Sequence, residues 1–410
     1  MPPSRQSQTP PRLFLSGMFD MRNFGDLMFP LVARERLSGF DIVAVSPTGA
    51  ATGFADALAS IPLDEMMAGE TGADGFLIGG GYMIHGHKMH FLDEYASLRD
   101  HAGPGLWLGA TLAAAARDVP IAWNAPGVPH PFAQSQRPLV DAALRAADYV
   151  SLRDTGSLEL LEAPGDAAVS VVPDPIASIA RLWPRRMLAG PFRNFLERKG
   201  ARRDARYLAL HFRNRSLARF GVPAAAAAVD AFAQAEHLVP ILVAVGQTHD
   251  DDTLAREISG LMSAPHILLD DPKELIEIAA VFGESALYIG ASLHGYIAAA
   301  AYGVPSVLVA QPSYRKFQGF LDHTGRGEDL VRDWPGAFAL AKGRADKSVP
   351  MAARVQDALD AHWRRVAQAL ADPARRRAER HAFLRQWLRL GAQAGGSSWP
   401  HTPYAKRGSG

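Results

Sequence analysis

The fold is most clearly indicated by residues 286–309, which read ALYIGASLHGYIAAAAYGVPSVLV. This stretch predicts a strand that ends near Gly290, an alanine-rich helix and a second strand that begins at Ser306. Ser292 has the side chain that a helix N-cap requires, and His294 then falls in the first turn. Because alanine is small, such a helix packs closely on a sheet.

The same region could be mistaken for a membrane span, because it holds no Asp, Glu, Lys or Arg from Ser285 to Tyr314. A membrane helix needs about 20 consecutive apolar residues, and polar residues, glycines and a proline interrupt this run. At the N-terminus the apolar stretch LFLSGMF is short and runs into Asp20, so it does not resemble a signal peptide. We expect a soluble, cytoplasmic protein.

The rest of the chain repeats the alternation of strand and helix. Apolar runs predict strands at 13–15, 41–45, 75–78, 120–123, 149–152 and 168–172, and again at 207–212, 239–245, 266–269, 286–290 and 306–309. Helical patterns separate most of them, which favours parallel sheets covered by helices on both faces. We therefore expect an α/β protein with two Rossmann-like, doubly wound domains that face a cleft, followed by C-terminal helices.

The domain boundaries follow from shifts in composition. Residues 181–206 hold nine Arg or Lys together with prolines and glycines, which is typical of a linker. We expect a disordered N-terminus at 1–12, an α/β domain at 13–184, a basic linker at 185–206, a second α/β domain at 207–345, helices at 346–390 and a disordered tail at 391–410.

Composition narrows the classes of function. The chain has 410 residues, 43 basic and 42 acidic, and a net charge of +1, which gives no reason to expect nucleic-acid binding. It has no cysteine, which excludes disulfides, thiolate catalysis and zinc sites built on Cys. Its 14 histidines leave histidine chemistry open.

Polar loops follow two strands of the first half. Asn23-Phe24-Gly25-Asp26 precedes a predicted helix at 27–37, where Asp26 has the side chain of an N-cap. Gly79-Gly80-Gly81 follows the strand at 75–78 and allows a ligand to approach the backbone. This glycine run is not a dinucleotide fingerprint. His85, His87 and His90 come next, and we rank surface or cleft-lining histidines above a metal site.

Further candidates lie at other strand ends. In the first half they are Arg153 and Asp154, which also suit a helix cap, and Asp174 between two prolines. In the second half, Arg213, His294 and Lys316 follow three different strands. Their side chains form a predicted cationic set that suits an anionic small molecule, because arginine forks onto carboxylates and phosphates. A solvated surface arginine remains the alternative for Arg213.

The chain resembles the polysaccharide pyruvyl transferase family in the order and spacing of its motifs. The resemblance extends over about residues 13–325 and rests on this set of matching segments: Asn23-Phe24-Gly25-Asp26, Gly79–Gly81, Ser151-Leu152-Arg153-Asp154 with Ser157, Pro173-Asp174-Pro175, Arg213, Ser292-Leu293-His294-Gly295, Gly303-Val304-Pro305 and Lys316-Phe317. It implies a fold like that of the GT-B glycosyltransferases. It also implies transfer of pyruvate from phosphoenolpyruvate to two hydroxyls of a sugar, which gives a cyclic ketal in the synthesis of bacterial exopolysaccharide or cell-envelope glycans.

The resemblance also implies roles for single residues. His294 and Asp26 are the expected catalytic pair, and no metal or organic cofactor is expected. The expected donor ligands are Arg213, Ser292, Leu293 and Lys316, and the expected acceptor side comprises Asn23, Gly79, Gly80, Gly81, Arg153 and Asp174. The chain departs from the family at one point: many members have Arg-Leu-His where this chain has Ser292-Leu293-His294. The role of the missing arginine is therefore absent here or falls to Arg315 or Lys316.

Two other functions fit the same fold. A nucleotide-sugar glycosyltransferase would need an acidic residue for the ribose, for which Asp270-Asp271 is the candidate. A non-catalytic glycan-binding protein is the second alternative, although the retention of His294, Arg213 and Lys316 speaks against it.

The C-terminal segment 374–390 carries six arginines against one acid, and Phe383, Leu384, Trp387 and Leu388 recur at helical spacing. The first interpretation is that this apolar face packs on the body of the protein. The alternative is a peripheral contact with anionic lipid, near a sugar or lipid-linked oligosaccharide acceptor.

Overall fold

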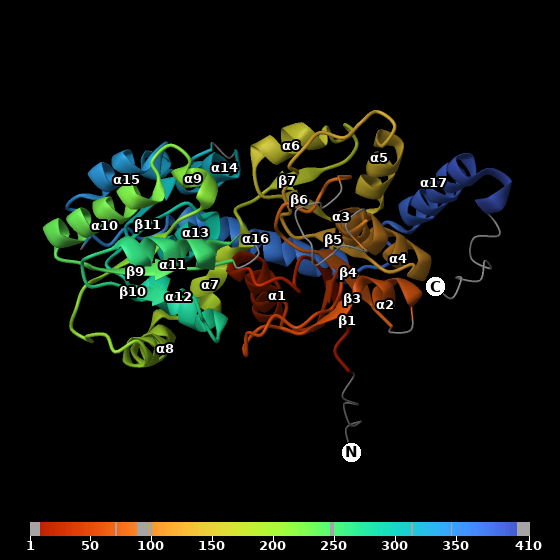
Figure 1. The fold of residues 1–410 in the computed structure, drawn as a ribbon. Helices are drawn as coiled ribbons and strands as arrows, with labels where there is room; N and C mark the ends of the chain where they lie inside the picture. Colours follow the sequence, from red (N-terminus) through yellow and green to blue (C-terminus); the bar gives the residue numbers. More distant parts are fainter. Residues whose placement is uncertain are drawn as a thin grey trace, which may run out of the picture.

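The computed structural model describes residues 9–69, 72–87, 98, 101–246, 250–312, 315–345 and 347–399. It consists of two α/β halves that lie side by side, with helices from the C-terminal segment running back to the first half (Figure 1). Each half contains its own parallel sheet, which confirms the predicted fold class.

The first half is built on a parallel sheet whose strand order is β3-β2-β1-β4-β5. A backbone bridge from Ala122 to Tyr149 joins its edge to a parallel pair, β6 and β7. Most of these strands are buried on both faces, which explains their nearly continuous apolar sequences. Their bounds are β1 (Arg12–Ser16), β2 (Asp41–Ser46), β3 (Ser60–Pro62), β4 (Gly75–Ile78), β5 (Ile121–Trp123), β6 (Val150–Leu152) and β7 (Val169–Val171).

Helices and helical turns connect the strands of the first half. They are α1 (Phe24–Arg36), α2 (Leu63–Ala68), α3 (Ala102–Pro104), the π-helical turn η2 (Gly105–Gly109), α4 (Ala110–Arg117), α5 (Arg137–Ala146), α6 (Thr155–Leu161), the 3₁₀ turn η3 (Pro175–Ser178) and α7 (Ile179–Leu182). Among the strands of this half, the prediction missed β3, because three half-buried residues leave little periodic signal, and it also gave no helix at α2, α3 or α7.

The second half repeats the design with the strand order β10-β9-β8-β11-β12-β13. Its strands are β8 (Tyr207–His211), β9 (Val239–Val243), β10 (Ile267–Leu269), β11 (Leu287–Gly290), β12 (Ser306–Val309) and β13 (Leu330–Val331). Its helices are α9 (Asn214–Leu217), α10 (Val222–Glu236), α11 (Asp251–Leu261), α12 (Leu275–Glu284), α13 (Leu293–Ala301), α14 (Arg315–Thr324), the 3₁₀ turn η5 (Gly327–Asp329) and α15 (Trp334–Ala341).

The segment expected to be a linker is mostly helical. Helix α8 (Arg185–Arg198) packs against α12 although it contains Pro191. At its end Arg198 and Lys199 form ion pairs with Asp271, and Arg198 also contacts Glu277. The basic residues that suggested a flexible connection therefore anchor this helix to the second half.

The two halves contact each other through backbone groups as well as side chains. The Phe24 amide of α1 donates to the carbonyl of Val245 over 2.8 Å. The Asp56 carboxylate accepts from the amides of Leu275 and Ile276 at 2.6 and 2.9 Å, so the first half caps helix α12 of the second. These bonds fix the start of α1 against the second half.

The C-terminal helices both return to the first half. Helix α16 (Ala353–Leu370) packs on β5, where buried His362 contacts Asn124 at 2.9 Å. Helix α17 (Arg377–Gly395) packs on α4 and α5, with Phe383 fully buried and Leu384 and Trp387 against the same core. The helix thus buries most of its apolar face on the protein. No described helix combines the length and the apolar character that crossing a bilayer would take.

The predicted disordered ends differ from the structure. Arg12 already belongs to β1, and α17 continues beyond residue 391 to Gly395. Trp399 packs over Gly391, where a β-carbon would come within 2.4 Å of the indole ring. This aromatic contact accounts for order that the Gly- and Ser-rich sequence did not suggest. Residues 1–8 and 400–410 lie outside the described part.

Candidate active site

Both sheets bring loops to a topological switch point, where the strand order reverses. In the first sheet this point lies between β1 and β4, and in the second between β8 and β11. Ligands of open α/β sheets bind at such points, beyond the carboxyl ends of the strands. The loops that follow these four strands contain Asn23–Asp26, Gly79–Gly81, Arg213 and Ser292–His294. The predicted site residues therefore occupy the switch points of both halves.

The start of α1 holds Asp26 inside the site. Asn23, not Asp26, is the N-cap: its side chain accepts from the amide of Gly25 at 3.1 Å. The helix begins three residues earlier than the sequence suggested, so the cap prediction for Asp26 was wrong. Its carboxyl group lies instead in the first turn. Burial there raises the pKa of Asp26, although interactions with His294, Lys316 and Arg153 act to lower it.

The three glycines after β4 have different reasons to be glycine. A β-carbon at Gly79 would lie 2.6 Å from the carbonyl oxygen of Ser16, and one at Gly80 would enter the ring of Phe29 at 2.0 Å. These two positions serve close packing of β4 on β1 and α1. Only Gly81, with a φ of +88°, comes near a site group, because its β-carbon would stand 3.2 Å from Oδ1 of Asp26.

His294 reaches across to the first half from the first turn of α13. Its Nε2 lies 3.7 Å from Oδ2 of Asp174, and its ring is edge-on to Phe29 with centroids 5.9 Å apart. Asp174 is buried and accepts from the amide of Ile176 at 3.0 Å. Although burial alone raises the pKa of Asp174, the adjacent His294 and Arg153 hold it below its usual range. An ionised carboxylate thus faces the imidazole.

The neighbours of His294 have structural tasks. Ser292 caps α13 by accepting from the amide of Gly295 at 3.2 Å, which confirms the predicted cap. Leu293 is buried in the apolar core. Their side chains therefore position His294, and neither offers a free polar group to the site.

Arg153 is a buried cation that the first half contributes. Its side chain is 4% exposed and lies over the ring of Tyr82, 4.1 Å from the centroid. It approaches Asp154 at 3.4 Å and Asp174 at 3.9 Å. Within the described part of the chain, however, its Nε and Nη2 have no hydrogen-bond partner. Buried donors are rarely left so, and they mark a place for an acceptor from a ligand.

Two cations of the second half complete this set. Burial, with the positive charges of Arg213 and Arg153, lowers the pKa of Lys316 to about 7. The Lys316 ammonium also lies 5.3 Å from the centre of the Tyr82 ring. The Nε of Arg213 is buried, and no described residue accepts a hydrogen bond from it. The cationic set predicted on the second half thus meets Arg153, Asp26 and Asp174 from the first.

The sequence did not single out two residues of this region. Tyr82, directly after the glycine run, lies under both Arg153 and Lys316, and its position next to that motif was a usable signal. His211, at the end of β8, lies 3.0 Å from Asp251 in a fully buried pair. That pair spans 40 residues of sequence, so no local pattern could reveal it.

The histidine cluster of the first half shows no metal geometry. His85 and His87 stack with ring centroids 6.3 Å apart, and His87 meets His130 edge-on at 4.7 Å. Burial and the neighbouring His87 lower the pKa of His85 to about 4. Across the described residues, no group of three or more ligating side chains could hold a metal ion. His90 lies outside those residues.

Taken together, the fold and the site define a two-domain α/β protein of GT-B-like architecture with a cluster of buried cationic side chains where its halves meet. The chain matches the family model "Polysaccharide pyruvyl transferase" over residues 22–313. This match covers most of both halves, and the chain belongs to the polysaccharide pyruvyl transferase family. The resemblance inferred from the motifs is confirmed.

Solved structures with the same architecture are distant in sequence. The UDP-GlcNAc 2-epimerase from Methanocaldococcus jannaschii is similar over 87% of this chain and 99% of its own, with a TM-score of 0.54 and 11% identity. The UDP-GlcNAc 2-epimerase from Neisseria meningitidis, bound to UDP-GlcNAc, has a TM-score of 0.52 and 10% identity over the same shares. These likenesses show the fold alone. No curated protein sequence matches the chain.

Proposed function

We propose that the protein transfers pyruvate from phosphoenolpyruvate to two hydroxyls of a sugar in the cytoplasm, during synthesis of bacterial exopolysaccharide or cell-envelope glycan. The observation that supports this most strongly is Arg153, a buried guanidinium whose Nη2 has no hydrogen-bond partner among the described residues and whose Nε has only the long ion-pair contact with Asp154 at 3.4 Å. Phosphoenolpyruvate carries a carboxylate and a phosphate on one small skeleton, so its oxygens match such donors.

The donor would lie between the halves. Arg213 and Lys316 of the second half bind its anionic groups, as the family resemblance implies. Arg153 supplies further hydrogen-bond donors from the first half, the side to which the resemblance assigns binding of the acceptor sugar. Anion binding also favours the charged form of Lys316, whose pKa of about 7 leaves it partly neutral in the free protein at physiological pH.

The reaction balances without a metal or an organic cofactor. A proton bonds to the methylene carbon of phosphoenolpyruvate, and the first hydroxyl oxygen of the sugar bonds to the central carbon. The bond from that carbon to the phosphate oxygen then breaks, and the phosphate leaves with the electron pair. The second hydroxyl oxygen bonds to the same carbon and closes the ketal. Of the two hydroxyl protons, one replaces the proton that was delivered to the methylene carbon, and the other leaves with the phosphate.

In this proposal His294 and Asp26 move these protons. Asp174, ionised and 3.7 Å from Nε2 of His294, orients the imidazole. Asp26, whose pKa burial raises, is suited to accept the proton of the attacking hydroxyl. Such general acid–base catalysis contributes typically about 10²–10⁴-fold to a rate.

A nucleotide-sugar donor is the alternative that the fold leaves open. Its candidate ribose ligands, Asp270 and Asp271, are already paired: Asp270 with Arg256 at 2.7 Å and Asp271 with Lys199 at 2.7 Å. Calorimetric titration with phosphoenolpyruvate and with UDP-GlcNAc separates the two functions. We expect heat only from phosphoenolpyruvate, and a weaker signal in an Arg153→Gln variant. Saturable binding of the nucleotide sugar alone would overturn the proposal.

The acceptor is a sugar or a lipid-linked oligosaccharide in this proposal. Helix α17 could bring the protein to an anionic membrane through its exposed arginines and Leu388, which is 58% exposed. Its other apolar residues are engaged with the first half, so the contact would be mainly electrostatic. Co-sedimentation with anionic liposomes, compared with a chain that ends at Asp372, tests this contact. Equal and negligible sedimentation of both would contradict it.

A further inference from the structure

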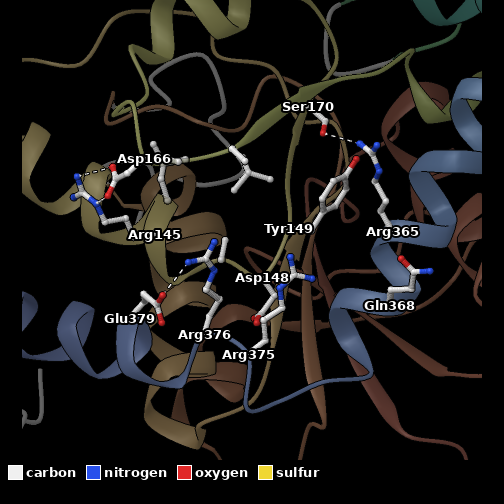
Figure 2. A pocket seen from close by; sticks show the side chains of 15 residues that line it. Arg145, Asp148, Tyr149, Asp166, Ser170, Arg365, Gln368, Arg375, Arg376 and Glu379 are labelled. Carbon is white, nitrogen blue, oxygen red and sulfur yellow. Dashed lines mark hydrogen bonds and ion pairs between the residues drawn. The ribbon is translucent and has the colours of Figure 1, made fainter.

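A cavity lies on the first half, away from the candidate active site. Its volume is about 400 Å³, and it opens where the start of β6, helix α5 and the turn between α16 and α17 meet (Figure 2). Cavities of this size accommodate small metabolites. At about 3.3 Å per residue, the four steps along the chain from Tyr149 to Arg153 put the cavity and the active site about 13 Å apart along β6. The two places are therefore at opposite ends of the same strand.

The cavity is lined by four arginines, and the partners of these arginines differ. Arg145 pairs with Asp166 at 2.8 Å, and both side chains are exposed, so this pair is weak. Arg365 donates to the hydroxyl of Ser170 at 3.2 Å and forms no ion pair with a carboxylate of the described residues. Figure 2 shows Arg375 and Arg376 between the Arg145–Asp166 pair and Tyr149.

Arg375 and Arg376 have unused donors. Arg376 pairs with Glu379 through Nη1 at 2.8 Å, while its Nε is buried and has no partner among the described residues. The guanidinium of Arg375 makes no hydrogen bond or ion pair within the described part of the chain. The remaining carboxylate of the cavity, Asp148, is held from behind by the fully buried Arg380 at 3.2 Å. The lining thus keeps more positive than negative charge.

Part of the lining is apolar. Ala147, Val150, Ala167 and Ala168 contribute to it together with the half-buried ring of Tyr149. A purely inorganic anion would leave these apolar groups uncovered, whereas a molecule with an anionic end and a compact organic body would contact both kinds of group. Arginine forks favour phosphate as the anionic end.

We propose that this cavity binds a phosphorylated small molecule, with its phosphate on Arg375, Arg376 and Arg365 and its organic body against Tyr149, Ala147 and Val150. The site is separate from the one proposed for phosphoenolpyruvate and does not depend on that function.

The test is calorimetric titration of the full chain with phenyl phosphate and with inorganic phosphate. A Lys316→Ala background weakens any binding at the active site. In this background we expect saturable, one-to-one binding of phenyl phosphate, tighter than that of inorganic phosphate. Arg375→Ala/Arg376→Ala should weaken it by about tenfold or more, because two charge-assisted contacts are lost.

The matched control is Arg385→Ala, which removes an exposed arginine of helix α17 outside the cavity lining. It should leave the affinity unchanged. If Arg375→Ala/Arg376→Ala misfolds, the single variant Arg375→Glu replaces it, because Arg375 is exposed. Absence of saturable binding, or equal affinity in the cavity variant and in the Arg385→Ala control, would overturn the proposal.

Discussion

The imidazole of His294 rests directly on the backbone of Gly25: a β-carbon at Gly25 would stand 1.6 Å from Nδ1 of His294. The two residues come from different halves of the protein and from the first turns of two helices, α1 and α13. Glycine at position 25 is therefore required by the catalytic geometry we propose, because any other side chain would displace the ring. The ring then has a fixed place between Gly25, Phe29 and Asp174.

This contact makes Gly25→Ala a sensitive test of the site. Alanine suits the helical backbone at this position, so the helix itself should not suffer. The new methyl group must move His294, and a displacement of about 1 Å costs about 10²-fold in rate. We expect kcat/KM for phosphoenolpyruvate to fall by that factor, measured as phosphate release.

The control for this variant is Gly190→Ala, in helix α8, where an added β-carbon meets nothing within 4 Å. It should keep full activity and gain slightly in thermal stability. If Gly25→Ala were as active as Gly190→Ala, the position of His294 would not matter for turnover.

His294→Ala should separate catalysis from folding. The side chain is partly exposed, and its contact with Asp174 is long at 3.7 Å, so the midpoint of thermal unfolding should change little. Phosphate release should fall by about 10²–10⁴-fold, the usual contribution of a general acid or base. A folded variant with turnover near that of the wild type would remove His294 from the mechanism.

Arg213→Lys tests which substrate this side chain holds. Lysine keeps the charge but lacks the planar fork that binds two oxygens at once. We expect the KM for phosphoenolpyruvate to rise about tenfold, while the KM for the acceptor stays the same. The opposite pattern, with only the acceptor KM changed, would assign Arg213 to the acceptor.

The pKa of Lys316, lowered to about 7 by burial and by Arg213 and Arg153, predicts an alkaline limit to donor binding. Lys316 is charged below this pKa and loses its charge as the pH rises through it. The kcat/KM for phosphoenolpyruvate should therefore decline above about pH 7, because this constant reports groups of the free enzyme. In Lys316→Arg, whose guanidinium stays charged, the decline should move to higher pH. An unchanged alkaline limb in that variant would show that another group titrates.

Local patterns predicted much of the fold. The strand ends at Gly290 and the cap at Ser292 follow from apolar runs and helix-cap preferences, and the structure confirms both. Helix α8 was missed because Pro191 and its basic residues resemble a linker. What stabilises this helix is a set of ion pairs with Asp271 and Glu277, more than 70 residues away in sequence. Such contacts leave no local trace.

The site was predicted in its residue types but not in its geometry. The sequence placed Arg213, His294 and Lys316 after strand ends and Asp26 at a helix start. The structure brings Asp26, Arg213 and His294 to the switch points of the two sheets, with Lys316 beside them at the start of α14, which follows β12. The sequence could not show that Gly80 serves packing on Phe29, or that Arg153 is a buried cation with unused hydrogen-bond donors. Both facts depend on how the two halves and their strands meet in space.

In the function we propose, phosphoenolpyruvate is the donor and a sugar diol is the acceptor. The direct experiment is to incubate the protein with phosphoenolpyruvate and a panel of acceptor glycans, and to follow inorganic phosphate and the product by mass spectrometry. We predict one pyruvyl ketal formed for each phosphate released, and neither with His294→Ala. A glycosyl mass increment from a nucleotide sugar, with no pyruvyl increment on any acceptor, would contradict the account.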